Sequence, residues 1–256
     1  MNKPTPADYP YLYLGSLSEA RRSDEAGLWR ASHQCNIACK QAIEAAIRAG
    51  FDGMHLKADC ARGVIAQYGF KRVGWVLANT IQKKRWDGRF RPRHKEWADT
   101  IFIPACDRTG EYIVESHPAV LDGFVEAFLD EVKGLSLFDA SQCDTLSGRS
   151  LEGEVLVLSP AALKESCWSP RNQLWLAESG FGCSPHASGR AIYATCLGDG
   201  ERTRWNRGDF IGILRDECFP EGAAVTDMAM NASWMDYRLG VLAGQDYWCG
   251  QKGTMG

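Results

Sequence analysis

Basic and aromatic side chains alternate in one short segment from Lys83 to Trp97. Its only acidic residues are Asp87 and Glu96. Lysine and arginine neutralise phosphates, while exposed aromatic rings stack on bases or on arginines. We therefore predict a nucleic-acid or partner-binding site there, formed by Lys83, Lys84, Arg85, Trp86, Arg89, Arg91, Arg93 and Lys95. The same charges suit an acidic protein surface. The alternative is a solvated loop whose aromatic side chains anchor it in the core.

A second set of residues has the types that bind zinc. Cys183 and His186 are separated by two residues, and Cys196, Cys167 or Cys218 would have to complete a tetrahedral site. Those three thiols stand singly, whereas strong zinc motifs contain two close pairs. We therefore predict no metal site, no cofactor and no catalytic residue, and a zinc-dependent hydrolase built on Cys183, His186 and Cys196 stays as an alternative.

The ten cysteines are spread over the whole chain, which begins without a signal-peptide pattern. We expect reduced thiols, buried as small apolar side chains, and a cytoplasmic protein. No apolar run reaches the 18 or so residues that a membrane span needs. A net charge of -3 argues against a strongly basic nucleic-acid binder, so any electrostatic function must be local.

Chain length and residue patterns predict an α+β protein with a helical N-terminal half and a smaller mixed α/β-sheet C-terminal module. The 256 residues, 45% of them hydrophobic, suffice for a sizeable core. The expected parts are a helical domain (1–140), a polar linker (141–152), a small β-rich module (153–222), and a C-terminal helix with a frayed tail (223–256).

Helix signals fill the first half. Ser16 and Glu19 have capping-box spacing, and Asp24 is expected to cap a long helix over residues 25–49. Cys35 and Cys39, four residues apart among alanines, are predicted to be packing residues. Apolar periodicity predicts further helices over residues 56–68, 70–83 and 118–133.

The pattern changes after residue 152. Short runs of β-branched, leucine and aromatic residues predict strands over 154–158, 174–177, 191–197 and 210–214. Pro160 opens a short helix over 160–165, and Thr226 begins a predicted helix that ends near Leu242.

The stretches YLGSLSEARRSDEAGLWRASHQCNIACKQAIEAAI and GFKRVGWVLANTIQKKRWDGRF resemble domain-of-unknown-function family 3849 over about residues 10–140. The stretch NQLWLAESGFGCSPHASGRAIYATCLGDGERTRWNRGDFIGIL is similar to a module that recurs in antirestriction-type accessory proteins. The resemblance implies a mobile-element context. It implies no catalytic residue, because the family brings no active site.

These observations favour a non-enzymatic mobile-element accessory protein. We expect an anti-CRISPR or antirestriction inhibitor that binds a host defence effector protein or its nucleic acid, with Lys83 to Lys95 as the contact. An inhibitor of this kind needs only surface complementarity. DNA or RNA binding during element transfer is the alternative in the same class, and the salt dependence of affinity would separate the two.

Overall fold

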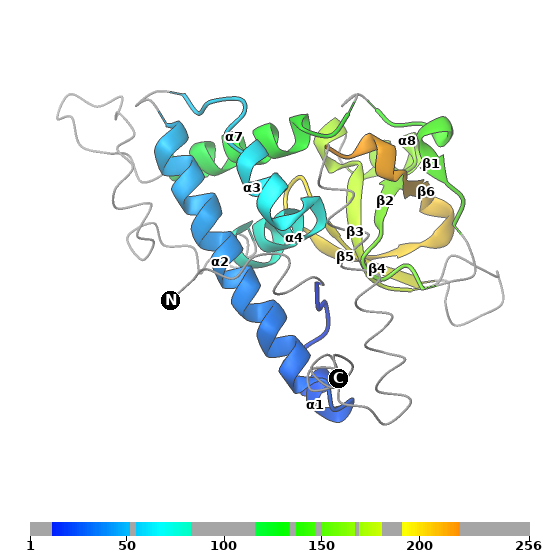
Figure 1. The fold of residues 1–256 in the computed structure, drawn as a ribbon. Coiled ribbons are helices and arrows are strands. Elements are labelled where there is room, and N and C mark those ends of the chain that lie inside the picture. Colours follow the sequence, from blue (N-terminus) through cyan, green and yellow to red (C-terminus); the bar gives the residue numbers. More distant parts are fainter. Residues whose placement is uncertain are drawn as a thin grey trace.

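A computed structural model of the chain describes residues 12–51, 55–82, 116–133, 137–146, 150–166, 169–180 and 191–220. Helices come first along the chain and a six-stranded antiparallel sheet follows (Figure 1). The α+β fold is therefore the one that the sequence predicts. The predicted helix that begins at Thr226 lies outside these residues.

The helical part begins with a short capped helix. Ser16 accepts a hydrogen bond from the Glu19 backbone, and the Glu19 carboxylate accepts one from the Ser16 backbone at 2.6 Å, which confirms the predicted capping box. The helices are α1 (Leu17–Arg22), α2 (Ala26–Gly50), α3 (Arg62–Tyr68), α4 (Phe70–Val76), the π-helix η1 (Leu77–Gln82) and α7 (Ser116–Asp130).

Three helix boundaries differ from the prediction. Asp24 has a left-handed φ of 57°, so the chain turns there and Glu25 becomes the N-cap of α2. Residue Leu56 pairs with Phe51 in an isolated antiparallel bridge, and α3 therefore starts only at Arg62. The helix predicted over 70–83 is α-helical only as far as Val76 and continues as η1.

The sheet contains β1 (Cys143–Asp144), β2 (Val155–Leu158), β3 (Leu174–Ser179), β4 (Ala191–Cys196), β5 (Arg202–Asn206) and β6 (Phe210–Leu214). Their order is β1-β6-β2-β3-β4-β5, and every neighbouring pair is antiparallel. Helix α8 (Pro160–Glu165), which the sequence predicts, lies between β2 and β3, and Ser159 is its N-cap. Part of the predicted linker forms β1, which pairs with β6.

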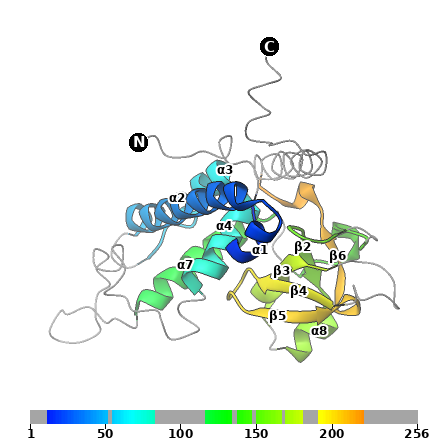
Figure 2. The ribbon, with the colours of Figure 1, turned by 90° about the horizontal axis from the view of Figure 1, so that it is seen from below.

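The sheet has a core on each side. On β3, Leu174 and Leu176 point to the helices and Trp175 points the other way, as strand alternation requires. We call the first core, around Phe70, Phe124 and Phe128, the helix-side core. The second core contains α8 residues and is called the α8-side core. Figure 2 shows α2, α4 and α7 gathered beside the sheet.

The helical part and the sheet share the helix-side core. Phe70 stacks on Phe128 with ring centroids 4.4 Å apart and lies 5.0 Å from Phe219, which follows the last strand. Next to them, the Lys71 ammonium pairs with the Glu154 carboxylate at 3.5 Å, although Lys71 is only 5% exposed. These contacts fix α4 against the sheet. Among the described helices, none is both long and apolar enough to cross a membrane.

Candidate functional site

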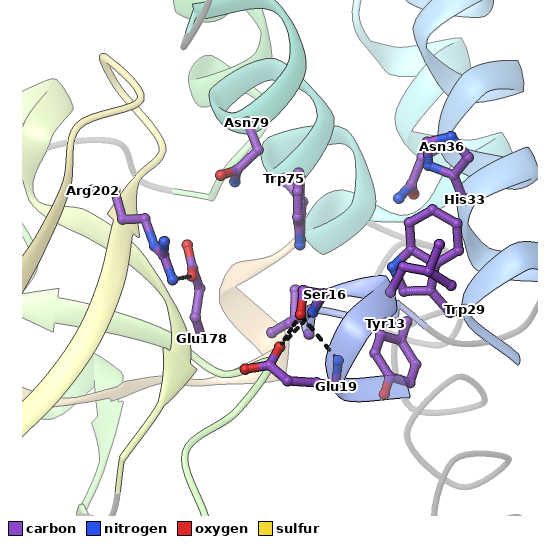
Figure 3. Close-up of a pocket in the computed structure, with 13 residues that line it drawn as sticks. Tyr13, Ser16, Glu19, Trp29, His33, Asn36, Trp75, Asn79, Glu178 and Arg202 are labelled. Atoms are coloured by element: carbon purple, nitrogen blue, oxygen red, sulfur yellow. Dashed lines mark hydrogen bonds and ion pairs between the residues drawn. The ribbon is translucent and has the colours of Figure 1, made fainter. Parts of the chain in front are cut away.

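A pocket of about 490 Å³ lies where α1, α2 and α4 meet β3 and β5 (Figure 3). Its volume is in the range of small-molecule sites. It is lined by Tyr13, Leu14, Gly15, Ser16, Leu17, Glu19, Trp29, His33, Asn36, Trp75, Asn79, Glu178 and Arg202. The lining is mostly aromatic and polar.

One wall of the pocket is built on α2. Trp29 and His33 are one helical turn apart and stack with ring centroids 4.7 Å apart and an angle of 12° between the planes. Tyr13 is held beside them because its hydroxyl donates to Glu25 at 2.8 Å and its backbone N–H donates to Ser32 at 3.0 Å. This wall therefore presents aromatic surface that is already positioned.

A second wall comes from α4 and η1. Trp75 and Asn79 are four residues apart, and Figure 3 shows both side chains pointing into the pocket. The indole N–H of Trp75 is buried and has no acceptor among the described residues. The helix changes from α to π immediately after this tryptophan, and π-turns often occur at functional sites.

Buried Arg72 fixes the amide of Asn36. Its guanidinium is fully buried and donates to the Ser32 carbonyl at 3.2 Å and to the Asn36 side-chain oxygen. Because arginine only donates, the Asn36 oxygen must face Arg72, which leaves the amide nitrogen as a donor. The two helical walls thus bring together two N–H donors, one from Trp75 and one from Asn36.

The sheet supplies an ion pair. Arg202 of β5 contacts Glu178 of β3 at 2.6 Å, and the Thr195 hydroxyl donates to the other oxygen of the same carboxylate. The β3–β4 register shifts between Ala177 and Ser179, so Glu178 lies at an irregularity that can redirect a side chain. The Glu178 carboxylate is therefore fully engaged by the sheet itself.

The second carboxylate of the lining belongs to Glu19. Hydrogen bonds from the Ser16 backbone and hydroxyl lower the Glu19 pKa, and the nearby positive charges of Arg22 and Arg202 act in the same direction. Two carboxylates, Glu19 and Glu178, face one guanidinium, Arg202, so the lining has a formal charge of -1. A phosphate group would be repelled from the inside of the pocket.

An exposed arginine of β5, Arg204, lies beyond the residues that line the pocket. Tyr193 pairs with Arg204 in the sheet register, as Thr195 pairs with Arg202, and alternate residues of a strand share a face. Tyr193 and Arg204 therefore lie on the same face as Thr195 and Arg202. Tyr193 is 45% exposed and both arginines are exposed. We call Tyr193, Arg202 and Arg204 the arginine face.

Comparison with known families gives a match for the helical part of the chain. Residues 12–133 match the family DUF3849, described as a protein of unknown function. We call residues 12–133 the DUF3849 segment. The match confirms the resemblance to this family over the first half of the chain. No curated protein and no solved structure matches the chain. Eleven of the thirteen lining residues belong to the DUF3849 segment, and Glu178 and Arg202 come from the sheet.

The binding site predicted from the sequence lies inside the DUF3849 segment but outside the described residues. This applies to all eight of its members: Lys83, Lys84, Arg85, Trp86, Arg89, Arg91, Arg93 and Lys95. The first of them, Lys83, follows Gln82, the last residue of η1, in the sequence. Asn79, which lines the pocket, is four residues before Lys83.

The residues considered for zinc do not form a set in the described part. Cys183, His186 and Cys167 lie outside it. Cys196 belongs to the α8-side core and Cys218 to the helix-side core, so the sheet separates them. Burial raises the pKa of both thiols, which disfavours the thiolate that binds metal. Within the described ranges, no three His, Cys, Asp or Glu side chains are arranged to hold a metal ion.

The helical cysteines are packing residues, as predicted. Cys35 and Cys39 are fully buried in the helix-side core of the DUF3849 segment. Burial raises the pKa of the Cys39 thiol far above its ordinary value, and the adjacent Cys35 adds to this effect. The Cys39 thiol is therefore a poor nucleophile at neutral pH.

The sequence analysis missed the pocket itself. Two signals were present: the pairs Trp29 with His33 and Trp75 with Asn79 each place an aromatic and a polar side chain on one helix face. Neither pair indicates which other segment faces it. Only the fold brings them to Glu178 and Arg202, about 100 or more residues later in the chain.

Proposed function

We propose that the protein is a non-enzymatic accessory protein of a mobile element, which counteracts a host defence effector by binding the effector or its nucleic acid. The mobile-element context is the part of the proposal that comes from the resemblance stated in the sequence analysis, whereas the family match over residues 12–133 carries no function. An anti-CRISPR or antirestriction role requires a binding surface and no catalytic group. The surface is the part of this proposal that the geometry supports.

The arginine face is the observation that carries the proposal. Exposed Arg204 and Tyr193 lie opposite each other on β5 and β4, next to a pocket lined by further aromatic rings. Arginines that follow a phosphate backbone, together with aromatic rings that stack on bases, are the usual elements of single-strand binding. We therefore favour nucleic acid over an acidic protein surface as the partner.

The predicted basic segment supports the same conclusion. Lys83 follows Gln82 directly, and η1 also supplies Asn79 to the pocket. By composition alone, this segment suits the same kind of ligand as the arginine face.

Fluorescence anisotropy with a labelled single-stranded oligonucleotide tests this function. We expect binding that weakens strongly between about 50 and 200 mM salt, because counterions are released from the phosphates. Arg204→Glu should weaken binding at least about tenfold. Lys164→Glu makes the same change of charge at an exposed position of α8, on the other side of the sheet, and should leave the affinity unchanged.

A second measurement separates the two kinds of partner. Pull-down of a purified CRISPR effector by the tagged protein is done with and without nuclease. Nuclease-sensitive capture supports nucleic acid as the contact, whereas nuclease-resistant capture without oligonucleotide binding moves the function to protein inhibition. If neither oligonucleotide nor effector is bound, the proposed function is wrong.

A further inference from the structure

We infer that the pocket binds one unpaired nucleobase, stacked against the Trp29–His33 wall and held by hydrogen bonds from the helical walls. The inference rests on the nucleic-acid form of the proposed function, because it identifies the part of the nucleic acid that would bind in the pocket beside the arginine face. The base could come from a free nucleoside or from an unpaired residue of a strand. Both sources present the same ring and the same acceptor atoms.

The aromatic wall suits a flat ligand. Trp29 and His33 already stack within 12° of parallel, so a planar ring can continue the stack without reorganising the helix. Tyr13 is anchored through Glu25 and Ser32, and Trp75 enters from the opposite helix (Figure 3). Base stacking on aromatic side chains is tolerant of sequence, since every base has a π-face.

The donors select a ligand with acceptor atoms. A buried indole N–H without an acceptor costs free energy, and a ligand oxygen or nitrogen at that position would remove the cost. Trp75 provides this N–H, and Asn36, whose oxygen is committed to Arg72, provides a second donor. Nucleobases carry ring nitrogens and carbonyl oxygens along their edges. A cationic ligand would leave both donors unsatisfied.

The charge distribution places the base inside and the phosphate outside. The lining carries two carboxylates and one guanidinium, and both carboxylates are already engaged, Glu178 by Arg202 and Glu19 by Ser16. A neutral base meets no repulsion there, whereas a phosphate is favoured at exposed Arg204. A nucleoside should therefore bind without help from its phosphate.

The test is a titration of the full-length protein with the four ribonucleosides, followed by ligand-observed NMR, alongside the labelled oligonucleotide. Trp75→Phe removes the N–H and keeps an aromatic ring, and it should weaken binding of the nucleoside about threefold to tenfold. Trp205→Phe is the matched control. Its indole nitrogen is also buried without an acceptor among the described residues, but it packs on the α8-side core and should not affect binding.

Arg204→Glu separates the two proposals. It should weaken oligonucleotide binding and leave nucleoside binding unchanged. If oligonucleotides bind but Trp75→Phe has no effect and no nucleoside binds, the pocket inference is overturned and the proposed function stands. If nucleosides bind and oligonucleotides do not, the pocket is a site for a free nucleoside and the nucleic-acid form of the proposed function fails. Binding of neither overturns the pocket inference and the nucleic-acid form of the proposed function.

Discussion

The two sides of the sheet end differently at strand β5. On the α8 side, Trp205 of β5 meets Trp175 and Phe210 edge to face, at centroid distances of 5.0 and 5.9 Å. On the helix side, the helix-side core includes residues from β2, β3 and β6 but none from β5. There β5 presents Arg202 and Arg204 instead. One side is closed by aromatic packing, and the other opens into the pocket and the arginine face.

This difference follows from the alternation of a single strand. In β5, Arg202, Arg204 and Asn206 are exposed, whereas Thr203 and Trp205 are half-buried. Edge strands often carry charged side chains, which keep them from pairing with other chains. Here the same charges adjoin the pocket, and the proposed function uses this edge as the binding surface.

The largest expected effect on stability comes from the closed centre of the helix-side core. Phe128→Ala removes a fully buried ring that stacks on Phe70, and should lower the free energy of unfolding by about 3–5 kcal/mol. Urea denaturation followed by circular dichroism measures the change. Phe128→Leu, with a cost of about 1–2 kcal/mol, serves if the alanine variant does not fold.

The same variant tests whether the two sides are one cooperative unit. Because β2 and β3 contribute to both cores, amides of the α8 side should lose hydrogen-exchange protection together with those of the helices. Retained protection in β3 and β4 of the Phe128 variant would show that the sheet is stable by itself.

A smaller effect is expected on the α8 side. Leu163 is 1% exposed, but it lies on a helix of six residues whose neighbours can close part of a cavity. Leu163→Ala should therefore cost about 2 kcal/mol, at the low end for such changes. The adjacent exposed Lys164→Ala is the control and should stay within about 0.5 kcal/mol. A loss larger than that of Phe128→Ala would reverse the comparison of the two cores.

Much of the fold was predictable because it depends on local signals. The capping box of Ser16, the proline-opened helix α8 and the apolar strands β2, β3, β4 and β6 were all recognised. Strand β5 was missed. Its sequence RTRWN contains no apolar run, since one of its faces is polar and it lies at the edge of the sheet.

The candidate site was less predictable, because it is assembled from distant segments. Tyr13, Asn79 and Arg202 share one pocket only after α4 has packed on β3. Clusters of one charge along the sequence, such as Lys83 to Lys95, are visible without a structure. Mixed sites, in which each segment supplies one or two polar groups, are not.

The capping box offers a pH test with a small effect. The folded-state pKa of Glu19 is lowered, so its charge stabilises the protein above the ordinary glutamate pKa of about 4.3 and ceases to do so as the pH falls through the folded value. Glu19→Gln keeps the capping geometry and removes the charge. At neutral pH it should cost less than about 1 kcal/mol, since the side chain is exposed and screened.

Urea denaturation of both proteins from neutral pH to pH 3 is the measurement. The difference in unfolding free energy should shrink as the pH falls, because wild-type Glu19 becomes protonated. A difference that is constant or grows toward acid pH would mean that the Glu19 charge does not stabilise the start of α1.

The smallest effect on stability is expected from the basic segment. Changing Lys84, Arg85 and Arg89 to glutamate should leave the free energy of unfolding within about 0.5 kcal/mol, because the sequence predicts a contact surface there and surface charges contribute little to folding. The same variant should lose partner binding in the anisotropy measurement. Loss of stability with intact binding would contradict the prediction. That result would mean that the helical part depends on these charges for its packing. The arginine face would then remain as the proposed binding surface.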